Sequence, residues 1–307
     1  MTTTTTTIGQ IDWDARRGKQ ESMLVMTWRR FRRHKPAMMG LGIISIIILG
    51  CVCVPLIIGF DQYNLPLALR RQPPSLAHPF GTDELGRDLL MRIWVGGRVS
   101  LSIGVSAMLV SILLGTIVGS TAGFYGGWTD NVLMRFADFL LSIPHLFALL
   151  LAAQIVRTMN IPEISGGPLP IVLIIGVLSW MGTSRMVRGQ FLALKVKEFI
   201  DAARVSGARN SRIMFRHILP NAVSPIIVSA TLHIGNAIIT ESTLSFLGFG
   251  VQPPMPSWGN MLKTAQSQMT YAPWVAIFPG LMILLTVISI NYIGDGLRDA
   301  LDPRHVE

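Results

Sequence analysis

The sequence predicts an all-α polytopic membrane protein with six transmembrane helices. Half of its 307 residues are hydrophobic, only 14% are charged, and the mean hydropathy is +0.50. A soluble domain of this length carries more charge and less apolar residue than this. The apolar residues also gather in long runs with polar segments between them, which is the pattern of membrane-spanning helices.

The first segment, residues 1–36, is predicted to be a basic and partly disordered cytoplasmic tail. Threonines fill positions 2–7, and the basic stretch WRRFRRHK occupies positions 28–35. Residues 37–59 are then apolar, over a length that crosses a bilayer core of roughly 30 Å at about 1.5 Å per residue. A cleaved signal peptide has a shorter apolar core, so we expect an uncleaved first span with its N-terminus inside.

Five further apolar runs predict a core of five helices over residues 99–295. The runs are 100–124, 132–156, 170–184, 222–247 and 274–293. With the N-terminus inside, Lys and Arg number 18 on the inner segments and 7 on the outer ones, leaving out Arg135 in the third span. This bias predicts an inner or plasma membrane protein with both termini cytoplasmic, an external loop at 60–98 and a cytoplasmic tail at 296–307.

The charge and the cysteines exclude several classes. The net charge is +9, but the basic residues flank the apolar runs, which favours anionic lipid as a partner over nucleic acid. Cys51 and Cys53 point in different directions on a helix, so we expect buried free thiols and no disulfide or metal pair.

The sequence holds no Gly-x-x-x-x-Gly-Lys-Ser/Thr phosphate loop. That loop cradles nucleotide phosphates, so the chain is not predicted to bind or hydrolyse ATP, and we expect neither a cofactor nor an enzymatic activity of its own.

A polar block at 185–220 interrupts the apolar runs on the predicted cytoplasmic side. Four of its residues recur at i, i+3, i+4 and i+7 and form one helix face that is small apart from the aromatic ring. They are Phe199, Ala202, Ala203 and Ser206. A small face lets another backbone approach closely. By itself the block also fits a less favoured alternative, a basic amphipathic helix lying on the bilayer surface.

Gly207 is predicted to end this first helix. Asn210 or Ser211 can cap a second helix, which is expected to end at Pro220. The pattern is therefore helix, glycine break, helix.

The spacing of Asp201-Ala202-Ala203, Gly207 and Leu219-Pro220 resembles the cytoplasmic EAA loop of bacterial ABC importer permeases. The resemblance implies that the loop docks as a short coupling helix into a groove on an ATP-hydrolysing subunit. Asp201 stands where that family usually has Glu, and His217 stands where it has Ile. Asp201 keeps the negative charge of Glu on a shorter side chain.

The external loop contains HPFGTDELGRD at positions 78–88. Turn-forming residues alternate there with acids and bases, which predicts an ordered loop held by ion pairs. The motif residues are Gly81, Thr82, Asp83, Gly86, Arg87 and Asp88. A catalytic or metal role for Asp83 and Asp88 would need further acidic or His ligands at suitable spacing.

This loop, with LSFLG at 244–248, QPP at 252–254 and PSWGN at 256–260, resembles the dipeptide/oligopeptide/nickel branch of these permeases, and within it the C-type member of the pair. The resemblance implies a heterodimer with a second permease subunit, two ATP-binding subunits and an external substrate-binding protein. It implies transport of peptides, or alternatively of nickel or another small solute.

Two other classes were weighed. A membrane-embedded enzyme would need a constellation such as His-Glu-x-x-His, which the sequence lacks. A passive channel would conduct without nucleotide. Neither explains an Ala-Ala-Gly loop in the cytoplasm.

Polar residues inside the spans are candidates for the translocation path. Glu241, Asn236 and His233 lie on the fifth span, although buried polar groups also serve helix packing. Asp138 of the third span can pair with Arg135 or take part in transport.

Small and aromatic residues leave two alternatives open. Gly115, Gly119 and Gly123 permit close helix packing, either within this chain or with a second subunit. Trp258 and Trp274 suit the membrane interface, or an external lip that receives a binding protein.

Overall fold

The computed structural model describes residues 23–59, 67–159 and 167–301. Within these ranges the chain is helical throughout its core, and the only β-structure is an isolated bridge between Thr82 and Asp88. In chain order the elements are α1 (Met23–Arg33), α2 (Lys35–Ile58), η1 (Leu67–Leu69), α3 (Leu89–Tyr125), α4 (Gly127–Ser142), α5 (His145–Thr158), α6 (Leu169–Leu178), α7 (Trp180–Leu194), α8 (Glu198–Val205), α9 (Asn210–Arg212), η2 (Ile213–Ile218), α10 (Leu219–Phe246), α11 (Trp258–Gln266) and α12 (Trp274–Leu301).

By length and composition, up to six segments of the described chain can cross a membrane. Four are single helices: α2, α3, the continuous helix Asn210–Phe246, and α12. The other two are bent pairs, in which α4 and α5 meet at 89° and α6 and α7 meet at 43°. The predicted all-α polytopic fold is confirmed, and the third and fourth spans, predicted as unbroken runs, are each divided in two.

The sharper bend lies at Pro144. Proline lacks the backbone N–H, and its ring disfavours helical geometry in the residue before it. Ile143 accordingly has φ −83° and ψ 127°, and α5 restarts at His145.

Helix α3 is the central element of the fold. Its first turn is capped by Asp88, whose side chain accepts a hydrogen bond from the Met91 N–H at 3.0 Å. The helix therefore begins inside the segment 60–98 that was predicted to be loop. It packs against α2, α6, α7, α10 and α12.

A glycine stripe on α3 lies against α7. A Cβ added at Gly115 would lie 2.5 Å from the Cβ of Thr183, and one at Gly123 would lie 2.7 Å from the Cβ of Phe191. Those positions need glycine because the α7 backbone approaches so closely. The stripe serves packing within the chain, as one of the two alternatives predicted.

Trp258 is a core residue, so its prediction as an interfacial anchor is wrong. Its side chain is fully buried, and its Nε1 donates a hydrogen bond to the Ile93 carbonyl at 3.0 Å. Trp274 is half-buried and its Nε1 donates to the Thr82 carbonyl at 3.3 Å. Each indole joins two segments that are distant in the sequence, because its N–H donates to a backbone carbonyl of the other segment.

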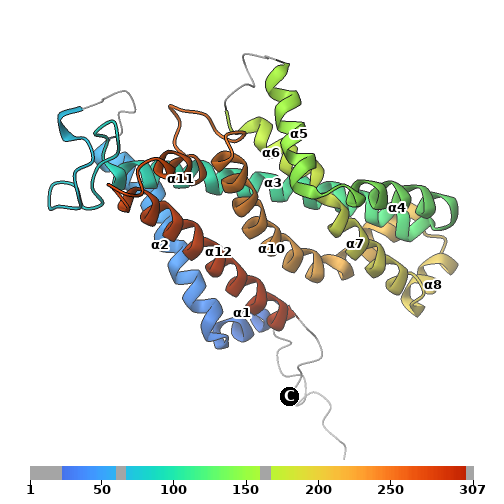
Figure 1. Ribbon diagram of the computed structural model, residues 1–307. Helices are drawn as coiled ribbons and strands as arrows, with labels where there is room; N and C mark the ends of the chain where they lie inside the picture. Colours follow the sequence, from blue (N-terminus) through green and yellow to red (C-terminus); the bar gives the residue numbers. More distant parts are fainter. Residues whose placement is uncertain (1–22, 60–66, 160–166, 302–307) are drawn as a thin grey trace, which may run out of the picture.

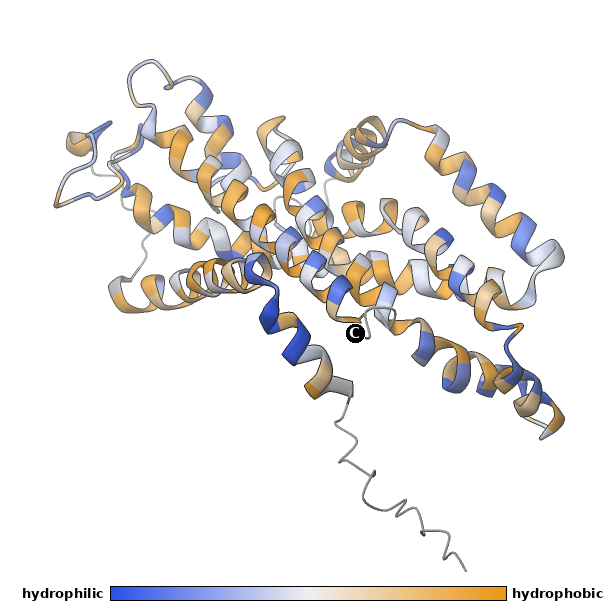
Figure 2. Ribbon diagram, turned by 90° about the horizontal axis from the view of Figure 1, so that it is seen from below, coloured by the Kyte–Doolittle hydropathy of each residue, from blue (hydrophilic) through white to orange (hydrophobic). Residues whose placement is uncertain are grey.

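The spans carry large apolar side chains on their outer surfaces, and Figure 2 shows the apolar ribbon of α2 beside the hydrophilic α1. Cys51 is buried and Cys53 is exposed on α2, so only the first matches the predicted buried thiol. In Figure 1, α2 and α12 run side by side, and α8 lies at the opposite end of the molecule from residues 67–88.

Candidate functional site

Helix α8 is built as predicted, a short helix ended by glycine. Glu198 and Asp201 lie in its first turn, where carboxylates favour the partial positive charge of the helix N-terminus. Gly207 has φ +79°, and the Ala208 N–H donates to the Ala203 carbonyl at 3.0 Å. This left-handed glycine closes the helix.

One side of α8 is fastened to the rest of the protein. Ile200 is the buried residue of this helix and is 0% exposed. It belongs to an apolar cluster contributed by α7, η2 and α10. The other buried members are Val187, Phe191, Ile213, Met214, Ile218 and Ala222. Ile200 therefore fixes α8 against this cluster, and α8 lies in direct contact with η2.

The other side of α8 is open. Asp201, Ala202 and Ser206 are exposed, Ala203 is half-buried, and Phe199 is 43% exposed. The small face predicted from the spacing is thus presented outward, with Ile200 holding the helix from behind. A helix anchored on one side and bare on the other is shaped to be covered by another protein.

The prediction that a second helix ends at Pro220 is wrong. One continuous helix runs from Asn210 to Phe246, and Leu219 and Pro220 lie in its interior as the first turn of α10. The six residues before them form the π-helical turn η2. Because a π turn is wider than an α turn, it takes up the proline without a break, and such turns are frequent at functional sites.

Helix α7 is also joined to α4 by charge. Arg188 binds Asp130 with both nitrogens, Nε to Oδ1 at 2.5 Å and Nη2 to Oδ2 at 2.6 Å. Arg185 pairs with Asp138. The alternative in which Asp138 pairs with Arg135 is therefore wrong, because the partner of Asp138 is Arg185 on the neighbouring helix α7 and not a residue one turn away on α4.

A cavity of about 440 Å³ lies where both bent pairs break. Its wall includes Pro144 and His145 at one break and Ser179 at the other. Residues of α3 and α10 complete the wall. The full lining is Ala107, Met108, Leu140, Leu141, Ile143, Pro144, His145, Ile175, Leu178, Ser179, Met181, Gly182, His233, Asn236, Ala237, Ile239 and Thr240.

The cavity lining is mostly apolar, with polar side chains at His145, Ser179, His233, Asn236 and Thr240 and no carboxylate, ammonium or guanidinium group. His233 and Asn236 line it, and the Nε2 of His233 lies 2.9 Å from the Thr183 hydroxyl. Broken helices with polar groups at the break are where membrane transporters hold substrate near the midplane.

The motif at residues 78–88 is an ordered loop held by ion pairs, as predicted. Asp83 is at its centre: Oδ1 accepts from the N–H groups of Leu85 and Arg87 at 2.9 and 3.0 Å, and Oδ2 accepts from the Arg87 Nε at 2.7 Å. Arg92 lies 3.5 Å from the same oxygen. Gly86 turns the chain at φ +80°.

The rest of this loop is tied to α3 and α12. Asp88 caps α3 and also lies 2.8 Å from the Nδ1 of His78. Thr82 is buried, and its hydroxyl donates a hydrogen bond to the Leu69 carbonyl at 2.5 Å. The ring of Phe80 stacks on that of Phe278, with 4.0 Å between the ring centroids. Gly81, at φ +75°, allows the close approach to Trp274. Asp83 and Asp88 are fully used in these contacts, which gives them a structural part.

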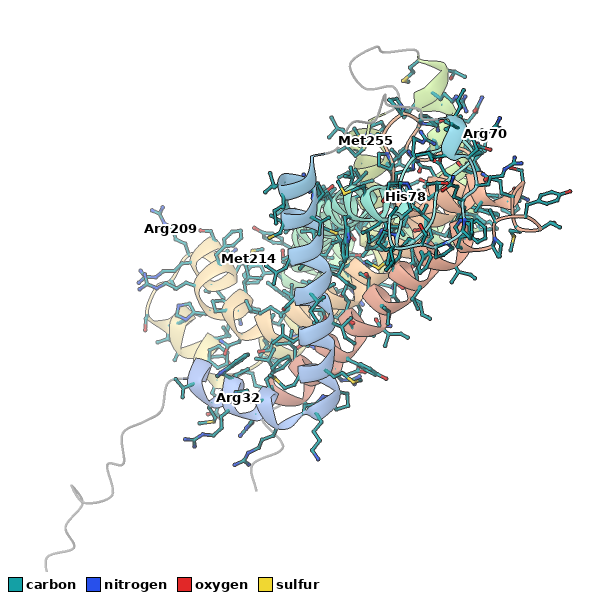
Figure 3. All side chains as sticks on the ribbon, turned by 90° about the vertical axis from the view of Figure 1, so that its left-hand side faces the viewer. Arg32, Arg70, His78, Arg209, Met214 and Met255 are labelled. Atoms are coloured by element: carbon teal, nitrogen blue, oxygen red, sulfur yellow. The ribbon has the colours of Figure 1, made fainter. Side chains whose placement is uncertain are left out.

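Figure 3 shows Arg70, His78 and Met255 gathered at one end of the molecule, away from Arg32 and Arg209. The loop 67–88 and the segment after α10 thus share one face, and the basic segments that contain Arg32 and Arg209 lie apart from it.

Two family descriptions match the chain. Residues 111–306 match the binding-protein-dependent transport system inner membrane component, and residues 22–74 match the N-terminal TM domain of oligopeptide transport permease C. The chain belongs to this family of binding-protein-dependent inner membrane permeases. It is a multi-pass permease subunit of an ABC importer.

Similar proteins extend over almost the whole permease. The oligopeptide transport system permease protein OppC of Bacillus subtilis is 43% identical over 275 residues, which cover 90% of this chain and 88% of that protein. The glutathione transport system permease protein GsiD of Pectobacterium atrosepticum is 43% identical, and the dipeptide transport system permease protein DppC of Alkalihalophilus pseudofirmus is 41% identical; the match covers 90% and 91% of this chain, respectively.

A solved structure of the MetNI methionine ABC transporter, in inward-facing conformations, shares the fold. One of its chains superposes with a TM-score of 0.50 at 20% identity, covering 68% of this permease and 97% of that chain.

Glu241 does not lie among the cavity residues. It is 0% exposed and accepts hydrogen bonds from the hydroxyls of Ser100 at 3.0 Å, Ser245 at 2.7 Å and Ser242 at 3.4 Å. The Ser100 hydroxyl in turn accepts a hydrogen bond from the backbone N–H of Trp258 at 3.1 Å. Glu241 therefore joins α3 and α10, and through Ser100 it is linked to the start of α11.

Sequence reasoning missed Ile200, the Asp130–Arg188 pair and the shared position of both helix breaks. Ile200 was visible as an apolar residue in a polar block, about 100° around the helix from Phe199. Asp130 and Arg188 are 58 residues apart, and no spacing rule links them.

Proposed function

We propose that this permease subunit forms half of the translocation pathway of an ATP-driven peptide importer, and that α8 is the helix through which ATPase subunits move it. One observation carries the proposal. α8 is attached by Ile200 to the buried cluster on α7, its opposite face is bare, and α7 begins at the wall of the central cavity.

The coupling site consists of the exposed residues of α8 and its closing turn, with the start of α10 behind them. It comprises Asp201, Ala202, Ala203, Gly207, Leu219 and Pro220. Movement of α8 on ATP binding would pass through Ile200 to α7, and through Arg188 to α4. Because α4 and α7 both border the cavity at their broken ends, the two rearrangements would switch the path between inward-facing and outward-facing states.

His233 and Asn236 are the proposed polar lining of this path. The cavity wall has no fixed charge, so it suits peptides whose side chains differ in sign, recognised through backbone amides by neutral donors and acceptors. The relatives named for oligopeptide, dipeptide and glutathione transport all carry peptides, which supports this substrate class over nickel.

The partners in this proposal are a second permease subunit, two ATP-binding subunits and an external substrate-binding protein, with both termini of this chain in the cytoplasm. ATP would be hydrolysed only in the partner subunits. The external loop, from Gly81 to Asp88, would then lie on the side that receives the binding protein.

The test is uptake into proteoliposomes that hold the complete complex. Labelled di- and tripeptides should enter only with ATP and the binding protein, and the double change H233A/N236A should lower uptake while leaving ATPase association unchanged. Uptake without nucleotide would indicate a channel. ATP-dependent uptake of nickel but not of peptides would assign the alternative substrate.

A further inference from the structure

Helix α1 is a basic amphipathic helix fixed at the end of α2 and α12. Phe31 is 4% exposed and packs with Ala37 and Ala300. His34 ends the helix, accepts a hydrogen bond from the Ala37 N–H at 3.1 Å through Nδ1, and lies 3.6 Å from Asp299 through Nε2. The helix is therefore held in one orientation.

The outward side of α1 combines apolar and cationic side chains. Val25 is 51% exposed and Trp28 is 50% exposed. Together with Arg29, Arg32 and Arg33 they line a hollow of about 430 Å³. The side chains of Arg32 and Arg33 make no hydrogen bond or ion pair with any residue that the structure describes.

This hollow adjoins the N-terminal end of the apolar span α2. The apolar run of α2 begins two residues after Lys35, so the guanidinium groups of α1 stand at the height of lipid headgroups. Figure 3 places Arg32 at the end of the molecule distant from Met255. Under the proposed orientation this is the cytoplasmic leaflet, and only the choice of leaflet rests on that orientation.

We propose that the hollow on α1 binds the headgroup of an anionic phospholipid. Guanidinium groups bind phosphate oxygens through paired N–H donors, and an indole ring is favoured at the boundary between headgroup and acyl chain. Val25 and Trp28 supply the apolar floor that a glycerol backbone and the first acyl carbons need. A free phosphate would use the arginines alone, and would gain nothing from these two side chains.

Lipid bound there would hold the end of the α2–α12 pair against the leaflet. A Cβ added at Gly296 of α12 would lie 3.2 Å from the Phe31 ring, so α1 packs closely against α12. The remaining helices would then move relative to a lipid-anchored pair.

The test is a phosphatidylglycerol titration of the purified full chain followed by native mass spectrometry. R32Q/R33Q should lower the affinity roughly 30-fold, since each arginine at an anionic surface contributes about a fivefold gain. The matched control R209Q/R212Q removes the same charge from two exposed arginines elsewhere and should leave the affinity unchanged. W28A keeps every charge and should still weaken binding several-fold.

Equal affinity for phosphatidylcholine, or equal losses in R32Q/R33Q and the control, would overturn the proposal. Displacement of the lipid by inorganic phosphate with W28A unaffected would indicate a bare phosphate site instead. Tighter, Arg32-dependent binding of a short RNA would indicate a polyanion site and would also overturn it. Thermal unfolding of each variant separates loss of fold from loss of the site, and none of these readouts depends on transport.

Discussion

Ile200→Ala should detach α8 from the permease without unfolding the rest of the chain. The isoleucine is 0% exposed within the cluster on α7 and η2, and replacing such a side chain by alanine costs about 3 kcal/mol through lost burial and the cavity left behind. α8 has no other buried residue, so this cost falls on the docking of one short helix. A change of about 3 kcal/mol shifts the ratio of docked to undocked α8 by roughly 100-fold.

Hydrogen exchange of the backbone amides in residues 198–208 measures that ratio, since local opening governs exchange in the native state. We expect exchange there to accelerate roughly 100-fold in I200A, and by about 10-fold or less in I200V, which removes one methyl group. Val205→Ala is the control: Val205 is 90% exposed, so its exchange should not change. In the assembled importer, I200A should lower ATP-driven uptake while hydrolysis continues.

Two results would refute this reasoning. Unchanged exchange in a folded I200A protein would mean that contacts other than Ile200 hold α8. Accelerated exchange across α3 and α10 as well would mean that α8 belongs to the global folding unit and is not a separately attached helix.

Three further changes follow from the same structure. Gly207 has φ +79°, and no atom lies within 4 Å of a Cβ added there, so only backbone strain of about 1 to 2 kcal/mol opposes substitution. In a pull-down assay, G207N should keep the ATPase subunit bound, whereas G207V should weaken ATPase binding. Equal retention of the ATPase by both variants would contradict this. R188Q removes the bidentate bond to Asp130 and should lower peptide uptake while ATPase association stays unchanged. The charge-swapped variant D130R/R188D should recover part of the uptake. Wild-type uptake by R188Q would exclude a part for α4 in coupling. E241L leaves three buried serine hydroxyls without their acceptor and should destabilise the chain by about 2 kcal/mol or more. In thermal unfolding, the midpoint of E241Q should fall between those of E241L and the wild type. Equal midpoints for E241L and the wild type would exclude a stabilising role for Glu241.

The positions of the spans and the glycine break could be predicted because each depends on local residues. Apolar length decides where a helix can cross, and a left-handed residue at position 207 requires glycine or a rare substitute. The exposed small face of α8 follows from helical periodicity alone.

The other features depend on contacts between distant segments. The burial of Trp258 depends on the Ile93 carbonyl in α3, and the pairing of Asp138 depends on Arg185 in α7. Pro220 was expected to end a helix, but the π turn before it is set by packing of the buried Ile213 and Ile218 against α7 and α8.

Glu241 was predicted to line the translocation path, but it is buried and hydrogen-bonded between helices, and this difference also depends on contacts between distant segments. Its sequence neighbours Ser242 and Ser245 gave no sign that Ser100 of α3 would complete the set of donors. A lone carboxyl in a span predicts a polar partner or water, and only the tertiary structure decides between them.

The most direct test of the central claim, that α8 couples this permease to ATPase subunits, is affinity purification of the tagged chain from gently solubilised membranes with identification of the retained proteins. We predict an ATP-binding subunit with a phosphate loop and a second six-span permease, and we predict that A203W loses the ATPase while keeping the second permease. Recovery of the folded chain alone, or full retention of the ATPase by A203W, would contradict the account.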